Sequence, residues 1–214
     1  MGHPVAVKID IEGTAPVSGL LQMPAAARAC YVFAHGAGAG MTHPFMAAVA
    51  DQLEKRGTAT LRFQFPYMER GSKRPDAPRT AHAAIRAAVA EAARRVPALA
   101  LIAGGKSFGG RMTSQAQAAS PLPDVRGLLF LSFPLHAAGK PSDERTGHLF
   151  DVKVPMLFVQ GSKDALADLK LLQPVIERLG PRATLHVVPD AGHSFHVRDE
   201  TIDAIVTWID GVIR

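Results

Sequence analysis

Continuously apolar runs alternate with segments of helical periodicity along this chain, and that order strongly limits the folds it can adopt. The runs at 31–34, 99–103, 127–132 and 155–160 lack the polar–apolar alternation of a sheet with one face in water. Strands of this kind occur in sheets that are covered on both faces. Because strand and helix alternate, parallel pairing through right-handed crossovers is expected. The sequence therefore predicts an α/β fold with a mostly parallel central sheet and helices on both faces.

The remaining predicted elements complete this pattern. Residues 5–11 alternate as a half-buried edge strand does, and 18–22 are expected to pair with them. Further strands are predicted at 58–63 and 183–188, and helices at 44–56, 81–96, 108–118, 167–179 and 200–213. Thr80 is expected to cap the second of these helices, and the Pro-, Gly- and charge-rich stretch 66–78 to form a loop. No repeat or long linker divides the chain, which predicts a single domain over 1–214.

Composition narrows the class of protein. A chain of 214 residues with 47% hydrophobic and 20% charged side chains can bury a sizeable core, which excludes disordered, collagen-like and disulfide-scaffold proteins. The single cysteine, Cys30, is predicted to pack in the core rather than to act as a nucleophile. The N-terminus lacks a signal-peptide pattern, and no apolar run is long enough to span a bilayer. A cytoplasmic protein without membrane contact is expected.

The turn after the strand at 99–103 carries the strongest chemical signal. It reads GGKSFGG over 104–110, which contains G-x-S-x-G with Ser107 at its centre, and a helix is predicted to follow. A sharp strand-to-helix turn of this kind strains the serine backbone and lifts its hydroxyl above the sheet. Glycine is needed two residues before and after, because a Cβ there would collide with the neighbouring strand and helix. Ser107 is therefore the predicted nucleophile; the alternative is a glycine-rich turn with an inert serine.

Two nucleotide-binding motifs come close to matching but fail. The GKS at 105–107 resembles the end of a phosphate-binding P-loop, but that motif needs glycine at position 100, where Ala100 stands. The glycines at 36, 38 and 40 suggest a dinucleotide-binding turn, which would need glycine where Met41 or His43 stands. Nucleotide binding therefore has little support.

A nucleophilic serine needs a base, and the base needs a carboxylate to orient it. The strand at 155–160 is followed by a tight turn that presents Asp164, and the strand at 183–188 is followed by a loop that contains His193. In a parallel sheet both loops lie at the same edge as Ser107. The order Ser107, Asp164, His193 predicts a triad in which His193 is general base and then acid.

Other residues compete for two of these roles. Asp168 and Asp190 are alternatives to Asp164, although Asp168 is expected to open a helix and to interact with its dipole. His196 is an alternative to His193. The conformational freedom of the chain at Gly192 favours His193 as the base. A metal site at the two histidines lacks an evident third ligand, so neither a metal nor another cofactor is predicted.

Acyl transfer also needs donors for the oxyanion of its intermediate. The backbone amide of Phe108, directly after the nucleophile, is predicted to be one donor. The second is expected from the loop HGAGAG at 35–40, where small residues let the backbone approach a bound carbonyl, and Ala37 is chosen. For His35 a role in holding this loop is the alternative to substrate contact. The predicted substrate-binding residues are His35, Gly36, His136 and Arg62.

The positive charge of the chain is concentrated in one region. Of a net charge of +5, residues 62–95 contribute eight basic side chains against three acidic ones. Arg62, Arg70, Lys73, Arg74 and Arg79 could favour an anionic substrate, and a solvated basic loop is the alternative. Nucleic-acid binding is not expected, because 6% aromatic residues and one tryptophan, Trp208, provide no stacking platform.

Four separated motifs, HGAGAG, GKSFGG, VQGSKD and DAGHSF, occur in the order found in the α/β-hydrolase superfamily, which this chain resembles. The segments RFQFPYMERG and SFPLHAAGKP are similar to a small dienelactone-hydrolase-like branch, which includes subunits of eukaryotic chromatin complexes. The resemblance implies a lidless, minimal hydrolase without a defined substrate. Ser107 stands where the dienelactone hydrolases use cysteine, which argues against that reaction.

Spacing agrees with a compact enzyme. About 22 residues separate the strands at 127–132 and 155–160, where many α/β-hydrolases insert a cap, so a short helix fits but a lid does not. The prediction is an open-site serine hydrolase for small or exposed acyl groups in esters or thioesters, with Leu135, His136 and the 66–79 loop at the rim. A binding or scaffold protein on the same fold is the alternative. The intact apparent triad favours the enzyme.

Overall fold

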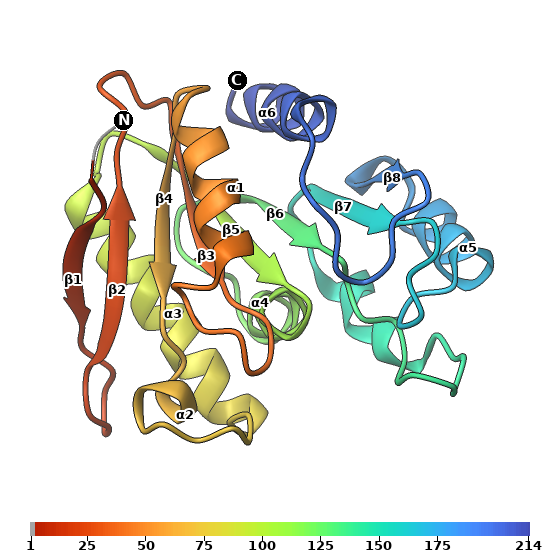
Figure 1. The fold of residues 1–214 in the computed structure, drawn as a ribbon, viewed down its shortest axis with the longest axis horizontal. Coiled ribbons are helices and arrows are strands. Elements are labelled where there is room, and N and C mark those ends of the chain that lie inside the picture. The colour runs from red at the N-terminus through yellow and green to blue at the C-terminus, as the bar shows by residue number, and fades with distance from the viewer. Residues whose placement is uncertain (1–2) are drawn as a thin grey trace.

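The computed structural model of the protein describes residues 3–214, and its centre is one eight-stranded sheet in the order β1-β2-β4-β3-β5-β6-β7-β8 (Figure 1). β1 and β2 pair antiparallel, as do β2 and β4, and all other neighbours are parallel. The strands are β1 (Val5–Ile9), β2 (Val17–Gln22), β3 (Ala29–Ala34), β4 (Thr58–Phe63), β5 (Ala100–Lys106), β6 (Val125–Leu131), β7 (Met156–Gly161) and β8 (Ala183–Val188). The predicted α/β class with a mostly parallel sheet is confirmed.

Helices cover both faces of the sheet (Figure 1). The side chains of α1 and α6 share one hydrophobic core, and those of α3, α4 and α5 belong to the other. The helices are α1 (Pro44–Glu54), α2 (Pro66–Glu69), α3 (Pro78–Arg95), α4 (Phe108–Ala119), α5 (Leu169–Leu179) and α6 (Asp199–Ile213), with 3₁₀ turns η1 (Glu144–Asp151) and η2 (Gly180–Arg182). The predicted helices therefore all form, within a few residues of the expected bounds.

The two cores explain why the strands read as unbroken apolar runs. Every residue of β3 is buried, and neighbours along it face opposite cores: Val32 packs with the α3–α5 side, and Phe33 with the α1–α6 side. The same division separates Phe130 from Leu129 in β6. A strand covered on both faces cannot alternate polar and apolar side chains without burying polar groups.

Three local details differ from the sequence-based expectation. α3 begins at Pro78 with Ala77 as its N-cap residue, so Thr80 lies inside the helix and the predicted cap is wrong. Proline is favoured at the first helical position because its φ is already helical and no amide is left without a partner there. The predicted 66–78 loop contains the short helix α2. β5 runs on to Lys106 and so brings the sheet directly up to Ser107.

Other expectations are confirmed. Asp168 is the N-cap residue of α5, where its side chain accepts a hydrogen bond from the Lys170 amide at 2.9 Å. The segment between β6 and β7 holds only η1, so there is no cap domain. Cys30 is buried, and burial raises the pKa of its thiol to about 12, as suits a core residue. Over residues 3–214, no helix is both long and apolar enough to cross a membrane.

Candidate active site

Ser107 occupies a strained turn between β5 and α4. Its φ of 50° and ψ of −113° lie in a region that non-glycine residues rarely adopt. The surrounding hydrogen bonds hold it there: the Ser107 amide donates to the Leu131 carbonyl at 3.0 Å, and the Ser107 carbonyl accepts from the Arg111 amide at 3.0 Å. The first bond ties the turn to β6 and the second starts α4, so the strain is imposed by both elements.

The glycines on either side of Ser107 allow α4 to approach β3 closely. A Cβ on Gly105 would lie 2.4 Å from the carbonyl oxygen of Ala34, and one on Gly109 would lie 2.5 Å from the same oxygen. Real side chains do not come so close to backbone oxygen, so the helix would have to move. The motif spacing is therefore a packing requirement that fixes the position of the serine.

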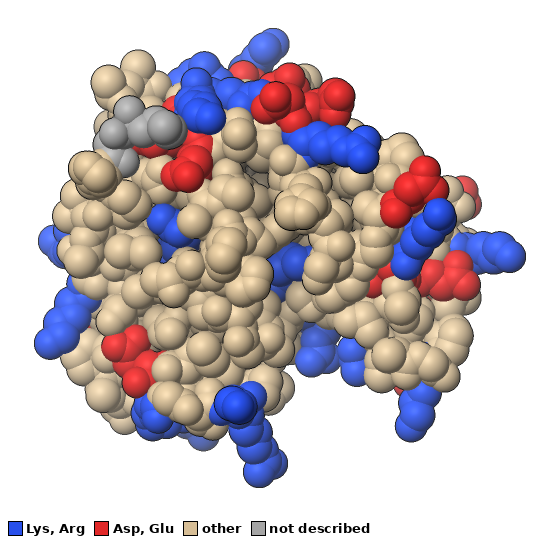
Figure 2. Space-filling model, viewed as in Figure 1, with Lys and Arg blue, Asp and Glu red and all other residues tan. Residues whose placement is uncertain are grey.

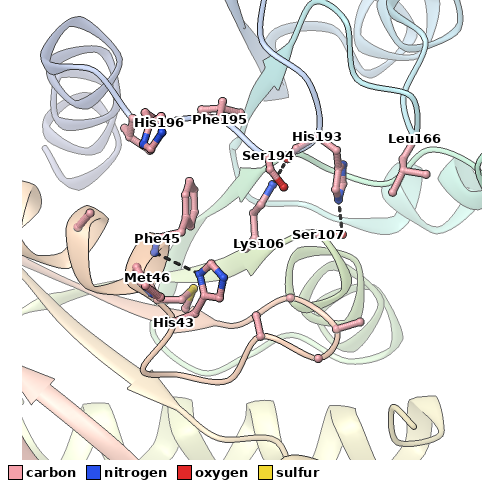
Figure 3. Close-up of a pocket in the computed structure, with 17 residues that line it drawn as sticks. His43, Phe45, Met46, Lys106, Ser107, Leu166, His193, Ser194, Phe195 and His196 are labelled. Atoms are coloured by element: carbon pink, nitrogen blue, oxygen red, sulfur yellow. Dashed lines mark hydrogen bonds between the residues drawn. The ribbon is translucent and has the colours of Figure 1, made fainter. Parts of the chain in front are cut away.

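His193 links Ser107 to a buried carboxylate. Its Nε2 lies 2.8 Å from Ser107 Oγ (Figure 3), and its Nδ1 lies 2.9 and 3.0 Å from the two carboxylate oxygens of Asp164. The Asp164 side chain is fully buried and also accepts hydrogen bonds from Gln160 Nε2 and the Leu166 amide. A carboxylate accepts only, so Nδ1 carries the proton and Nε2 is free to accept one from the serine.

The competing residues lie elsewhere. Asp168 caps α5, and Asp190 is exposed and forms an ion pair with Lys163 at 2.8 Å. His196 lines the same pocket as Ser107, whereas the hydrogen bond to the serine comes from His193. The structure thus brings together Ser107, Asp164 and His193, the three residues preferred from sequence.

His35 supports the loop at 35–40 from below. It is fully buried; its Nε2 accepts from the Phe65 amide at 3.1 Å, and its Nδ1 donates to the Gly36 carbonyl at 2.7 Å. Burial lowers its pKa to about 4, so the ring is neutral at pH 7. His35 does not line the pocket and holds the loop, as the alternative prediction stated, whereas Gly36 does line the pocket.

Two amides near Ser107, that of Ala37 in the same pocket lining and that of Phe108 next in the chain, make no hydrogen bond to the described part of the protein. Within the 35–40 loop, the Gly38 amide donates to Tyr67 Oη at 2.9 Å and the Ala39 amide to the Gly36 carbonyl at 3.2 Å. Across residues 3–214, no protein acceptor takes the amides of Ala37 or Phe108. Phe108 is the first residue of α4, where helix geometry provides no acceptor for the amide.

Arg62 and His136 are buried and form hydrogen bonds that connect separate segments of the chain. The Arg62 guanidinium, 3% exposed, donates to Gln22 Oε1 at 3.2 Å, and burial lowers its pKa. His136, 4% exposed, accepts from the Asp168 amide at 3.3 Å through Nε2 and so connects the segment after β6 to α5. Neither lines the pocket around Ser107, where contact with substrate was predicted for both. Arg62 was predicted from its positive charge near the rim and His136 from its position in a rim segment, and residues of buried polar networks show the same signals in a sequence.

The serine opens into a pocket of about 800 Å³ with a mainly apolar lining. Phe45 and Met46 from α1 and Phe195 from the loop after β8 form part of its wall, and Lys106 enters beside them (Figure 3). Sequence reasoning missed these residues. Lys106 could have been suspected from its place next to the nucleophile. Phe45 and Phe195 are far apart in the chain, and no sequence signal joins them.

The basic loop, residues 66–79, does not line this pocket. None of its arginines and lysines lines the pocket that the described residues form, and Arg70 is paired with Asp76 at 3.0 Å. Figure 2 shows most Lys and Arg side chains around the periphery of the visible face, with blue atoms also recessed in a hollow near its middle. The charge surplus read from the sequence is therefore separate from the charge in the site.

The position of each group defines the class of protein. A strained serine after β5, an acid after β7 and a histidine after β8, all at the same edge of the sheet, is the arrangement of the α/β-hydrolases. Residues 27–207 match the model of the α/β hydrolase domain family, and the chain belongs to that family. The resemblance inferred from the motifs is thus confirmed.

Solved structures show the same fold. A dienelactone hydrolase from Anabaena variabilis has a TM-score of 0.75 and 22% identity, with 98% of this chain and 95% of that chain covered. An α/β serine hydrolase without lid from Xanthomonas campestris has a TM-score of 0.74 and 21% identity, with 100% and 95% covered. Est1E from Butyrivibrio proteoclasticus, solved with ferulic acid bound, has a TM-score of 0.79 and 18% identity, with 97% and 99% covered. This chain is similar to compact, lidless hydrolases.

Proposed function

We propose that this protein is a serine hydrolase that cleaves carboxylic esters or thioesters through an acyl-enzyme on Ser107. One observation carries the proposal: His193 Nε2 lies 2.8 Å from Ser107 Oγ and can accept the hydroxyl proton. The buried carboxylate of Asp164, 2.9 Å from His193 Nδ1, fixes the orientation of the ring. Membership of the α/β-hydrolase family supports the reaction class. The resemblance to lidless hydrolases supports an open site.

In this mechanism Ser107 Oγ attacks the carbonyl carbon and its proton moves to His193 Nε2. The amides of Ala37 and Phe108 donate to the oxyanion of the tetrahedral intermediate. Collapse of the intermediate breaks the bond to the leaving alcohol or thiol, which takes the proton from His193. Water then attacks the acyl-enzyme, gives a proton to the same nitrogen and releases the acid, and Ser107 regains its proton. Asp164 holds the ring and stabilises its charged form. The sequence of steps needs no cofactor.

The pocket supports a small acyl substrate. Its lining is mainly apolar, and no cap domain encloses it, so short or exposed acyl groups fit better than long chains. A reducing compartment such as the cytoplasm agrees with the one cysteine, which is buried.

The proposal is tested by labelling the native protein with a fluorophosphonate probe and mapping the modified peptide. We expect the adduct on Ser107. A native protein with no adduct there would overturn the enzymatic function and leave a binding or scaffold protein on a hydrolase fold.

Turnover of p-nitrophenyl esters of increasing chain length tests the size of the acyl group. We expect the highest kcat/KM for short acyl chains. Activity that rises steadily beyond octanoate would contradict a small substrate.

A further inference from the structure

Lys106 places a cation next to the nucleophile. It is the last residue of β5, and its side chain lines the pocket beside Ser107 (Figure 3). The ammonium nitrogen donates a hydrogen bond to the backbone carbonyl of His193. It also lies 5.3 Å from the ring centroid of Phe45 and 5.5 Å from that of Phe195. The two rings, 6.0 Å apart and nearly perpendicular, thus flank the charge.

This cation has no carboxylate partner of its own. Among the described residues, no ion pair is formed by Lys106, and no Asp or Glu lines the pocket. Asp164 attracts the charge from a distance but is already bound to His193. An ammonium has three N–H donors, of which the His193 carbonyl takes one. The remaining donors lie in a largely apolar pocket, where an unpaired charge is costly.

The cost of burial is visible in the acidity of the group. Burial lowers the pKa of Lys106 to about 8, which leaves the side chain mostly charged at pH 7. An anion entering the pocket would meet a partly desolvated ammonium, and charge-assisted hydrogen bonds of this kind are stronger than neutral ones.

On the basis of the proposed hydrolase function, we propose that Lys106 selects acyl substrates that carry a carboxylate, namely half-esters of short dicarboxylic acids. The ammonium binds the free carboxylate while Ser107 attacks the ester at the other end of the acyl chain. Because Lys106 Nζ contacts the His193 carbonyl and Ser107 Oγ contacts the ring of the same residue, the two ends of the substrate are separated by a short spacer. Phe45 and Phe195 contact the methylene groups between them.

The basic loop provides the contrast. Lys73 lies on its exposed surface and is not a lining residue of the pocket. Any selectivity for anions that arose from the general positive charge of the protein would depend on such residues. Selectivity that arises inside the pocket depends on Lys106 alone, so the same substitution at the two lysines separates the two sources.

The experiment compares kcat/KM, by pH-stat at pH 7, for the monomethyl esters of succinic, glutaric and adipic acids with methyl butanoate, pentanoate and hexanoate. The wild-type protein should prefer the best half-ester over its neutral counterpart by about tenfold or more. In Lys106→Gln, which keeps an N–H donor for the His193 carbonyl but loses the charge, the ratio should fall about tenfold. Lys106→Arg should keep a ratio above one, and Lys73→Gln should keep the wild-type ratio.

A ratio is used because both ester series share the same chemical step, so a general loss of turnover cancels. If a variant hydrolyses neither ester series, a protection assay replaces the ratio. Glutarate should protect Ser107 of the wild type from a fluorophosphonate better than glutaramide does. This difference should vanish in Lys106→Gln.

Equal ratios in the wild type and Lys106→Gln, or an equal loss in Lys73→Gln, would overturn the role of Lys106. If Ser107 forms an adduct while both ester series react alike, only this inference fails; without the adduct the proposed function fails as well.

Discussion

Within residues 3–214, the structure contains two hydrogen-bonded serine–histidine pairs, and both serines belong to the same turn-and-helix segment. Ser107 Oγ lies 2.8 Å from His193 Nε2, and Ser114 Oγ lies 2.7 Å from His148 Nε2. The two serines are seven residues, or about two helical turns, apart. By distance alone the pairs are equivalent, so their differences show what a nucleophile requires beyond a neighbouring base.

The first difference is the direction of the proton. Ser114 lies in regular helix, fully buried, and its hydroxyl donates to the Arg111 carbonyl at 2.8 Å. Since a hydroxyl has one proton, His148 Nε2 must then donate to Ser114 Oγ and cannot act as its base. At Ser107 the strained turn removes the hydroxyl from helical backbone acceptors and points it at an Nε2 that is free to accept.

The second difference is the charge behind each ring. His193 faces the Asp164 carboxylate, a buried acceptor that keeps the proton of the ring on Nδ1. Burial, with smaller contributions from the nearby Arg111 and His82, lowers the pKa of His148 to about 4, and only Asp151 acts in the opposite direction. His148 is thus neutral near pH 7 and poorly suited to accept a proton. A partly buried serine–histidine contact of this kind stabilises the fold and does not activate the serine.

The largest expected effect separates the two serines. Ser107→Ala should abolish fluorophosphonate labelling and lower ester turnover by at least about 10⁴-fold, because the bond-forming oxygen is lost. Ser114→Ala should remain labelled at Ser107 and retain turnover close to wild type. Intact-mass spectrometry and initial rates measure both. Loss of labelling in Ser114→Ala with an unchanged melting temperature would contradict the assignment.

The carboxylate behind His193 comes next. Asp164→Asn should lower kcat by about 10³- to 10⁴-fold, because an amide can reverse the tautomer of His193 and no longer stabilises its charged form. Asp190→Asn, which changes an exposed acid at the same edge of the sheet, serves as the matched control and should leave kcat unchanged. Rates of Asp164→Asn within tenfold of wild type would mean that another group orients the histidine.

Glycine substitutions test whether close backbone packing holds the turn at Ser107, in contrast to the open surroundings of Gly147 beside His148. Gly109→Ala places a Cβ 2.5 Å from the Ala34 carbonyl oxygen and should lower the free energy of unfolding by about 3 kcal/mol. Gly147→Ala, next to His148, meets nothing within 4 Å and should change stability by less than about 1 kcal/mol. Urea unfolding measures both. Equal stabilities of the two variants would show that close packing does not hold the turn.

The smallest effect concerns pH. The pKa of His148 is lowered to about 4 in the folded protein, from an ordinary value of 6.5, so its neutral form is preferred on folding. This stability is present above pH 6.5 and is lost as the pH falls toward 4. Between pH 7 and pH 5 the melting temperature should therefore fall by about 2–4 °C less in His148→Gln than in wild type, after allowing for partial exposure.

His3→Gln, at an exposed position, is the control for this titration and should follow the wild type. An identical decline in all three proteins would assign the acid sensitivity to other groups, of which His35, also with a pKa of about 4, is the first to consider.

Much of the site followed from local sequence. The apolar run before Ser107, the glycines around it and the order of acid and histidine after later strands are constraints that act within a few residues. The burial of Arg62 and His136 away from the pocket could not be predicted, for the opposite reason. Each satisfies partners that come from distant segments, Gln22 for one and the start of α5 for the other.

The sequence by itself determined the layered fold and the strained serine, because strand periodicity and the steric demand for glycine are local properties of the chain. Only the tertiary structure decided in which of two serine–histidine pairs the histidine can accept the hydroxyl proton, since the reversed hydrogen bond of Ser114 depends on where η1 places His148. It also decided where positive charge matters. The charged loop is solvated, whereas Lys106 is enclosed by two rings that folding brings together from opposite ends of the chain.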